Sequence, residues 1–450
     1  MSVWGTPWGR RRLPVECGTV ILVLTVTGAV MGILSATLGD VAFLIALAVV
    51  CAALALVDPP LVAVVALPAT VLQSRVGGLL SVADLVLALA AAVVLILVRP
   101  QGLRSMQSLL WAGTFYLACS LPSVVLNPFS SNIIEWFHEV ALVLGSMIVG
   151  FAVGRTGRAS LAARLYLLAC LVIAAWASAV GLIYIAQGAL QPVGLPDLNK
   201  NTIGGMLGFA IVMVYARPTW LRLPSWMTWG TILLCGAGIS AAQSRQAMVG
   251  AIAGVFIVSL RRRPETGRFP KIVWFAAVPV LFIVLTMVND QLDSGNQFNS
   301  SYQRLSWYAE TIRIWLTSSV FGVGQRWWYT GQFGEAFQPP NAELEVLSTF
   351  GVVGLGGFLV MFAVAIWATW RINPVYGTVG TAIIATRFVQ AQFDLYWVAG
   401  QASLLWIIAG ICYGVLERDR AQGTEIVLPG RDSRHRQRRI LPRPVPPRSV

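Results

Sequence analysis

Charged residues are scarce in this chain of 450 residues. They make up 11% of the sequence, against about 25% in an ordinary soluble domain, while 57% of the residues are hydrophobic. The mean hydropathy of +0.73 points the same way. These values exclude an ordinary soluble globular protein and predict a membrane protein.

Histidines and paired cysteines are also lacking. The chain has two histidines, His138 and His435, and its six cysteines are scattered without a CxxC pair. The common zinc and redox motifs are therefore absent from the sequence, and buried, unreactive thiols are the better interpretation of the cysteines. We expect no metal and no cofactor.

Long apolar runs fill the sequence instead. A helix needs about 20 mainly apolar residues to cross a bilayer, and continuous runs favour helices over the alternating strands of a barrel. We predict an all-α polytopic membrane helix bundle with 12 to 14 transmembrane helices. The runs lie near 18–38, 41–57, 60–74, 82–98, 107–126, 133–153, 163–187, 201–216, 226–243, 246–260, 271–288, 343–369, 377–393 and 395–416. The weakest of them are 60–74, 246–260 and 377–393.

The net charge of +13 is unevenly distributed along the chain. If both termini are cytoplasmic, 25 of the 32 Lys and Arg residues fall on the inner side and 7 on the outer side. Cytoplasmic loops retain basic residues, so this division predicts an N-in, C-in topology with an even number of spans. It also explains the positive charge without a nucleic-acid partner.

The apolar runs and the charge distribution together predict four regions. Residues 1–288 form an N-terminal bundle, 289–342 a long extracytoplasmic loop, 343–416 the C-terminal membrane helices and 417–450 a disordered basic tail. The tail either binds anionic lipid of the inner leaflet or is a solvated segment that fixes topology, and the second interpretation is slightly favoured. Glycines at helical spacing, at 204, 205 and 208, at 250 and 254, and from 351 to 357, are assigned to helix packing.

The outer loop contains an amphipathic segment. In 301–318, Leu305, Ala309, Ile312 and Leu316 share one helical face, and Arg304, Tyr308, Thr311 and Trp315 share the neighbouring face. Such a helix lies along a membrane surface or re-enters it, and Glu310 can pair with Arg313. Trp327 and Trp328 either mark the membrane interface or form platforms for sugar rings, and the interfacial interpretation is favoured.

Three outer arginines are candidates for function. Arg245 lies where a polar turn enters a span, Arg304 lies in the loop, and Arg387 is deeper in a span and could pair with Asp394. An arginine near the hydrocarbon usually faces a partner or an aqueous cavity. For Arg245 and Arg304 we favour binding of a diphosphate, because guanidinium groups bind phosphate through two hydrogen bonds.

Four motifs occur in order: NKNTIGGMLGF, QSRQAMVG, R-x2-W-x7-W leading to FGVG, and PPNAELEVLSTFGVVGLGGF. In this order, beside a long outer loop, they resemble the O-antigen ligase and polymerase superfamily of bacterial envelope glycan enzymes. The resemblance covers roughly 195–370 and is strongest at 301–358. It implies about a dozen helices and an outward active site that moves a glycan from an undecaprenyl-diphosphate carrier to an acceptor glycan. It also implies that Arg245 and Arg304 hold the carrier diphosphate.

The chain departs from this superfamily at the proposed base. The superfamily commonly has a His-Asn pair where this chain has Pro340-Asn341, and proline cannot accept a proton. Glu343 is our preferred substitute, because partial desolvation at the end of a span could give it a useful pKa. A salt bridge from Glu343 to Arg245 or Arg304 is an equally good interpretation, and Glu345 has a similar claim. For His138 a hydrogen bond with Glu135 or Glu139 is favoured over a place in the cavity.

The sequence thus predicts a membrane glycosyltransferase in the bacterial inner membrane. Its partners are a polyprenyl-diphosphate-linked glycan donor, an acceptor glycan or glycolipid, and membrane lipid. Asn341 would orient the acceptor. Further substrate contacts are expected from Asn201, Tyr308, Arg326 and Arg387. Two alternatives stay open: a lipid-linked glycan transporter or flippase, against which the absence of repeats counts, and a non-catalytic homologue that binds glycan lipid.

Overall fold

The structure is a computed structural model that describes residues 46–76, 80–261, 300–334, 337–398 and 400–426. The predicted spans at 18–38 and 271–288, and His435, lie outside these residues, as does most of the predicted tail. The helices are Ala46–Val57, α2 (Pro60–Ala69), α3 (Val82–Val93), α4 (Gln107–Leu126), α5 (Ser130–Val140), α6 (Ser146–Arg155), α7 (Ala159–Ala186), α8 (Lys200–Ala216), α9 (Ser225–Ala242), α10 (Arg245–Leu260), α12 (Ser300–Thr317), α13 (Ala342–Arg371), α14 (Pro374–Ala391) and α15 (Gln401–Ala421).

Several shorter elements complete the described chain. π-helical turns at Val94–Val98 and Ala141–Gly145 continue α3 and join α5 to α6. Short 3-10 turns lie at Leu103–Met106 and Trp327–Tyr329. The two strands, β1 (Arg75–Val76) and β2 (Leu80–Ser81), form one antiparallel pair. The described residues are therefore mostly helical with very little strand, as the apolar runs predict.

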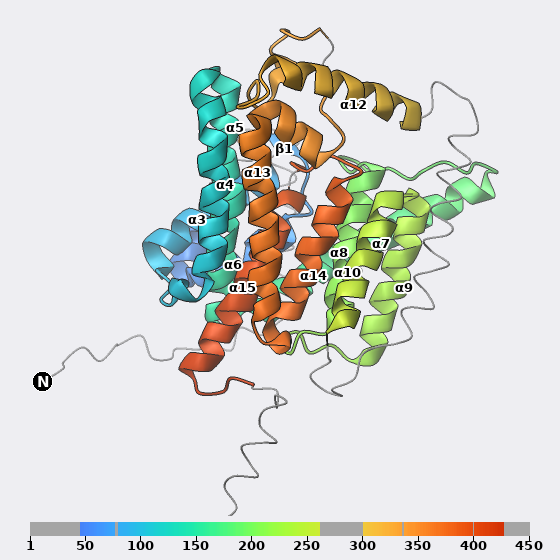
Figure 1. The fold of residues 1–450 in the computed structure, drawn as a ribbon. Coiled ribbons are helices and arrows are strands. Elements are labelled where there is room, and N and C mark those ends of the chain that lie inside the picture. The colour runs from blue at the N-terminus through green and yellow to red at the C-terminus, as the bar shows by residue number, and fades with distance from the viewer. Residues whose placement is uncertain (1–45, 77–79, 262–299, 335–336, 399, 427–450) are drawn as a thin grey trace, which may run out of the picture.

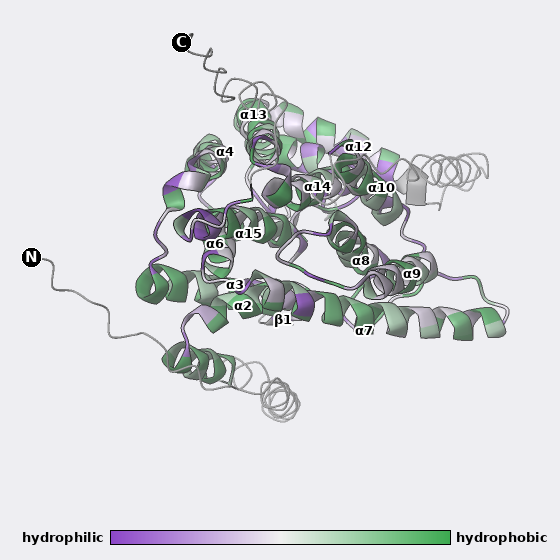
Figure 2. Ribbon diagram, turned by 90° about the horizontal axis from the view of Figure 1, so that it is seen from below, coloured by the Kyte–Doolittle hydropathy of each residue, from purple (hydrophilic) through white to green (hydrophobic). Residues whose placement is uncertain are grey.

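Most helices run side by side along one direction, and α12 lies across one end of the bundle (Figure 1). We name this the α12 end. In the view along the bundle, α15 lies inside, between α6, α8 and α14 (Figure 2). Nearly all of α15 from Gln401 to Leu416 is buried, so this helix is surrounded by protein.

Small residues allow the central helices to touch. A Cβ added at Gly150 of α6 would lie 2.0 Å from the carbonyl oxygen of Ile407 in α15, and one at Gly414 would lie 2.2 Å from that of Phe151. Close backbone contact of this kind is a common way for helices to associate in lipid. Gly204 and Gly250 have the predicted packing role as well: Gly204 faces Ser244, and Gly250 faces Gln390.

Among the described residues, four helical segments are long and apolar enough to cross a membrane: Leu103–Leu126, Ser130–Arg155, Ala159–Ala186 and Ala342–Arg371. Others, such as α8 and α10, are apolar but shorter. These helices support a membrane protein, whereas the number of spans and the sidedness stay predictions.

Basic residues are divided between the two ends. At the end away from α12, Arg158 pairs with Asp58, Arg418 lies beside Gly157, and Arg261 donates to the carbonyl oxygen of Ile372 at 3.0 Å. All three arginines belong to the set predicted to be cytoplasmic. The described basic residues of the predicted outer set, such as Arg304 and Arg326, lie toward the α12 end.

Candidate functional site

The amphipathic helix predicted in the outer loop is present as α12. Leu305, Ile312 and Leu316 are 55%, 42% and 62% exposed, so the predicted apolar face points away from the protein. Arg304 and Tyr308 on the neighbouring face are half-buried, and Glu310 accepts a hydrogen bond from Arg313 Nε at 3.0 Å. The helix thus turns Arg304 and Tyr308 toward the protein and leaves an apolar stripe available to lipid.

Trp327 and Trp328 are buried, which contradicts the interfacial interpretation. They pack with Ile314, Val323 and Phe337 in a small core beneath α12, and Trp327 Nε1 donates to Ser348 Oγ at 3.2 Å. Sequence alone missed this because neighbouring aromatics have the same pattern in an interfacial belt and in a buried cluster.

Arg304 of α12 lies near two basic side chains of other helices, and we call the three the basic cluster: Lys200, Arg245 and Arg304. Burial and the charge of Arg304 lower the pKa of Arg245. Burial and the charges of Arg245 and Arg304 lower the pKa of Lys200, with Asp394 acting in the opposite direction. Each of these influences requires proximity, so residues from three separate helices lie within electrostatic range of one another.

Local sequence places each cation of the cluster at the start or inner face of a helix. Asn199 caps α8 by accepting hydrogen bonds from the backbone of Asn201 and Thr202, both at 2.9 Å, which fixes Lys200 at the helix start. Arg245 is the first residue of α10 and follows a turn in which Gln243 has φ of 53°. Helix N-termini are positive, so an anion there would be favoured by backbone and side chains together.

The segment between α14 and α15 provides acidic and polar groups near the cluster. Asp394 accepts a hydrogen bond from Gln246 at 2.7 Å. Burial raises the pKa of the Tyr308 hydroxyl, Asp394 raises it further and Arg304 lowers it. Tyr308 donates to the carbonyl oxygen of Pro340 at 3.5 Å, which joins α12 to the start of α13.

Asn341 and Glu343 are held at the start of α13. The Asn341 side chain accepts from the backbone of Leu344 at 2.9 Å and donates to the carbonyl oxygen of Gln392 at 3.0 Å. Asn341 is therefore a helix cap, and its role in orienting the acceptor stays a prediction. Glu343 Oε1 accepts a hydrogen bond from Gln392, and its buried Oε2 has no hydrogen-bond partner among the described residues. Neither predicted arginine forms a salt bridge with Glu343 in the described structure.

A break in α13 positions the loop that follows α12. Gly351 has φ of 66° and ψ of −167°, a conformation open essentially to glycine alone. The loop enters the break, where Val323 and Gly324 donate backbone hydrogen bonds to Ser348 and Thr349 at 2.9 and 3.0 Å. The next residues, Gln325 and Arg326, are thereby directed toward α5.

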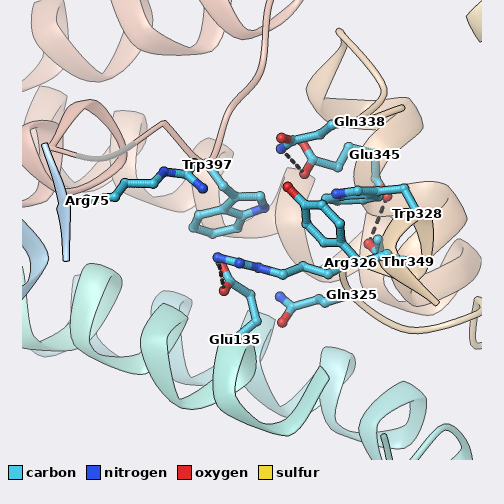
Figure 3. A pocket seen from close by; sticks show the side chains of 10 residues that line it. Arg75, Glu135, Gln325, Arg326, Trp328, Gln338, Glu345, Thr349 and Trp397 are labelled. Carbon is cyan, nitrogen blue, oxygen red and sulfur yellow. Dashed lines mark hydrogen bonds and ion pairs between the residues drawn. The ribbon is translucent and has the colours of Figure 1, made fainter. Parts of the chain in front are cut away.

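A small polar cavity lies between this loop, α5 and α13 (Figure 3). Its volume is about 30 Å³, and its lining includes Arg75, Glu135, Arg326, Trp328, Glu345 and Trp397. That volume holds one or two water molecules and excludes a sugar ring. Glu345 is buried and accepts from Gln338 at 2.7 Å.

Arg326 and His138 belong to a chain of ion pairs beside this cavity. Arg326 Nη2 lies 2.6 Å from Glu135 Oε2, so its guanidinium is bound to α5, and its predicted substrate contact stays a prediction. His138 Nδ1 is 3.3 Å from Glu135 Oε1, and its Nε2 is 3.3 Å from Asp84 Oδ2. The hydrogen bond to Glu135 confirms the favoured interpretation of His138.

Arg387 is enclosed by protein, and its predicted substrate contact stays a prediction. It is fully buried and donates to Gln401 Oε1 at 3.1 Å and to the backbone carbonyl oxygens of Leu395 and Tyr396. No ion pair joins it to Asp394 among the described residues. Arg387 thus organises the segment between α14 and α15, while Asn201 contributes its backbone to the cap of α8.

The sequence did not single out Lys200, although it precedes the predicted Asn201, and it did not place Asp394 at the site. The places of Lys200 and Asp394 at the site become visible only in the structure, where α8, α10 and the segment after α14 come together under α12. Among the described residues, no group of three or more His, Cys, Asp or Glu side chains could hold a metal ion.

No protein-family model matches the chain, and no curated protein matches it.

Proposed function

We propose that the chain is a membrane glycosyltransferase of the O-antigen ligase and polymerase type. It would transfer or polymerise a glycan from a polyprenyl-diphosphate carrier onto an acceptor glycan at the extracytoplasmic face of a bacterial cell membrane. The observation that supports this proposal best is the basic cluster of Lys200, Arg245 and Arg304 beneath an amphipathic helix.

The cluster favours an anionic ligand for an electrostatic reason. Cations brought together from separate helices repel one another, and the lowered pKa of Lys200 and Arg245 reflects that repulsion together with burial. Asp394 supplies one negative charge within range of Lys200. A bound diphosphate would add negative charge at the cluster, and guanidinium groups match its oxygens in geometry.

In the proposed reaction, an acceptor hydroxyl oxygen attacks the anomeric carbon of the donor sugar. A new C–O bond forms, and the bond from that carbon to the diphosphate oxygen breaks with its electron pair leaving on the diphosphate. Arg245, Arg304 and Lys200 stabilise the charge that develops there. Glu343 accepts the hydroxyl proton, and its Oε2 accepts no hydrogen bond from the described residues.

The two alternative functions predict different results when the protein meets a lipid-linked glycan donor. Pro340 is buried and cannot take the proton that a histidine would take, which favours the non-catalytic glycan-lipid-binding alternative. A transporter or flippase would use the same cations to hold the lipid diphosphate while it changes leaflet. Purified protein in proteoliposomes with a labelled undecaprenyl-diphosphate glycan and an acceptor glycan separates the three: transfer, change of leaflet without transfer, or binding alone.

Arginine-to-lysine variants test the cluster in the same assay. Arg245→Lys and Arg304→Lys each keep the charge but lose the paired hydrogen bonds, so we expect transfer to fall about tenfold or more. Arg313→Lys is the matched control, because Arg313 lies on α12 but is exposed and pairs with Glu310. Normal transfer by both cluster variants would remove the diphosphate clamp from the proposal.

A further inference from the structure

A second basic pocket lies at the opposite end of the bundle from α12. Its volume is about 460 Å³, within the range of about 300–1,000 Å³ typical of ligand sites. The turn from α8 to α9 forms most of it, and Ile426 beyond α15 closes one side.

The sequence builds this pocket through two proline breaks. Pro218 follows Arg217, which ends α8 in a left-handed conformation with φ of 46°. Pro224 then precedes α9, so the first turn of α9, including Ser225 and Thr228, lines the pocket. Ile426 is held in place because its backbone donates to Tyr376 Oη at 3.0 Å.

The pocket presents positive charge without a compensating acid. Arg217 and Arg222 line it, and Arg164 Nη2 donates to the carbonyl oxygen of Arg222 at 3.3 Å. No acidic side chain lines the pocket, and within the described residues no carboxylate pairs with Arg217 or Arg222. The N-terminus of α9 lacks a side-chain cap and adds partial positive charge on the same side.

The surroundings place the pocket at the depth of lipid headgroups. Trp226 and Trp229, in the first turns of α9, are 75% and 54% exposed, a position typical of tryptophan at a membrane–water interface. Val214, Leu221 and Leu223 give the pocket an apolar side next to its polar side. A ligand that fits would combine a phosphate with an acyl-bearing body.

We propose that this pocket binds the headgroup phosphate of an anionic phospholipid from the leaflet at this end of the bundle. Arg217 and Arg222 would hold the phosphate, and the hydroxyls of Thr219 and Ser225 would bind its remaining oxygens. Basic pockets between membrane helices on the cytoplasmic side bind such headgroups, and the distribution of basic residues predicts that this end is cytoplasmic. The inference rests on residues separate from the basic cluster, so it does not depend on the proposed transferase activity.

Native mass spectrometry of the full-length protein tests this lipid site. The protein in detergent is titrated with phosphatidylglycerol, with phosphatidylcholine, and with inorganic phosphate alone. The detergent is then removed in the mass spectrometer. We expect phosphatidylglycerol to bind with defined stoichiometry and phosphatidylcholine to bind at least roughly tenfold more weakly, because the neutral headgroup offsets its phosphate charge. Saturation by inorganic phosphate at comparable concentrations would overturn the lipid proposal in favour of a soluble anion.

Variants separate a shaped pocket from a diffuse positive surface. Arg217→Gln with Arg222→Gln should weaken phosphatidylglycerol binding by about 25-fold, roughly fivefold for each charge. Arg99→Gln with Arg104→Gln removes the same charge near the same end but outside the lining, and should change binding little. Ser225→Trp fills the pocket from an exposed position without changing charge, and should also abolish binding. If both double variants weaken binding equally and Ser225→Trp has no effect, the pocket is not the site.

Discussion

The basic cluster shows at the residue scale what a sequence can and cannot place. Arg245 and Arg304 are predictable candidates because an arginine near the hydrocarbon needs a reason to be there. Burial and the charge of Arg304 lower the pKa of Arg245, which is consistent with a shared site. Lys200 was missed because a lysine one turn before an apolar run is ordinary, and nothing in its local sequence indicates which distant helices it will meet.

Lys200 should make ligand binding depend on pH. Its pKa lies below the ordinary value of 10.5, because burial and the charges of Arg245 and Arg304 disfavour the protonated form. The cation exists below this pKa, so affinity for undecaprenyl diphosphate should be retained at neutral pH and fall as the pH rises through this lowered pKa. Lys200→Arg should retain affinity over this range, whereas Lys200→Met should lose about tenfold or more at pH 7.

The same variants distinguish a binding role from a structural one. Lys200→Met relieves repulsion in the ligand-free protein, so its thermal unfolding temperature should stay the same or rise. A clear drop in that temperature, with affinity lost in proportion, would indicate that Lys200 supports the fold instead.

Glu343 and Glu345 are the two candidates for the general base of the proposed reaction. Glu343 lies against the segment that carries Asp394, whereas Glu345 lines a cavity too small for a sugar. We expect Glu343→Gln to reduce transfer by about 100-fold or more, with binding of undecaprenyl diphosphate unchanged.

Glu345→Gln serves as the comparison for the base. Its amide can still bond to Gln338, so transfer should fall far less than in Glu343→Gln. Loss of transfer in Glu345→Gln alone would reassign the base. Retention of transfer in both variants would favour a dissociative route in which the cations supply most of the catalysis.

At the scale of elements, helical periodicity predicted α12 well and the break in α13 poorly. The apolar and polar faces of α12 follow directly from spacing, because exposure to lipid and contact with protein sort residues by type. Gly351 was assigned to helix packing, but it also carries a backbone conformation that sequence does not reveal. The buried Trp327 and Trp328 depend on that break, because the loop that carries them is hydrogen-bonded into it.

Gly351→Ala should therefore destabilise the protein. A Cβ at this position would lie 2.2 Å from the carbonyl oxygen of Val320, and the backbone conformation would be strained besides. We expect a loss of about 2 kcal/mol or more in the free energy of unfolding, measured as a lower unfolding temperature in detergent. Gly356→Ala on the same helix is the control, because its Cβ would meet nothing within 4 Å and alanine favours helix. Equal unfolding temperatures for the two variants would contradict the role of the break.

At the scale of the whole molecule, composition predicts a helical membrane protein and charge predicts its orientation. The count of spans is harder, because α14 and α15 are shielded by other helices and can carry polar residues such as Arg387 and Gln401 without facing lipid. Hydropathy alone cannot distinguish a buried helix from one that faces the bilayer. The orientation is easier to predict than the number of spans, because it depends on basic residues in the loops and not on the helices of the interior.

Cysteine labelling tests this orientation. Gln332 near α12 and Gln422 beyond α15 are both exposed and lie at opposite ends of the bundle. The sequence-based topology assigns 25 of the 32 basic residues to the inner side together with the end of the chain that carries Gln422, so we expect that side to be cytoplasmic. In intact spheroplasts an impermeant maleimide should label Gln332→Cys and leave Gln422→Cys unlabelled until the membrane is permeabilised.

The parent chain is the control, since its described cysteines are buried or half-buried. Labelling of Gln422→Cys alone in intact spheroplasts would invert the topology. The basic cluster would then face the cytoplasm, where an extracytoplasmic transferase could not use it.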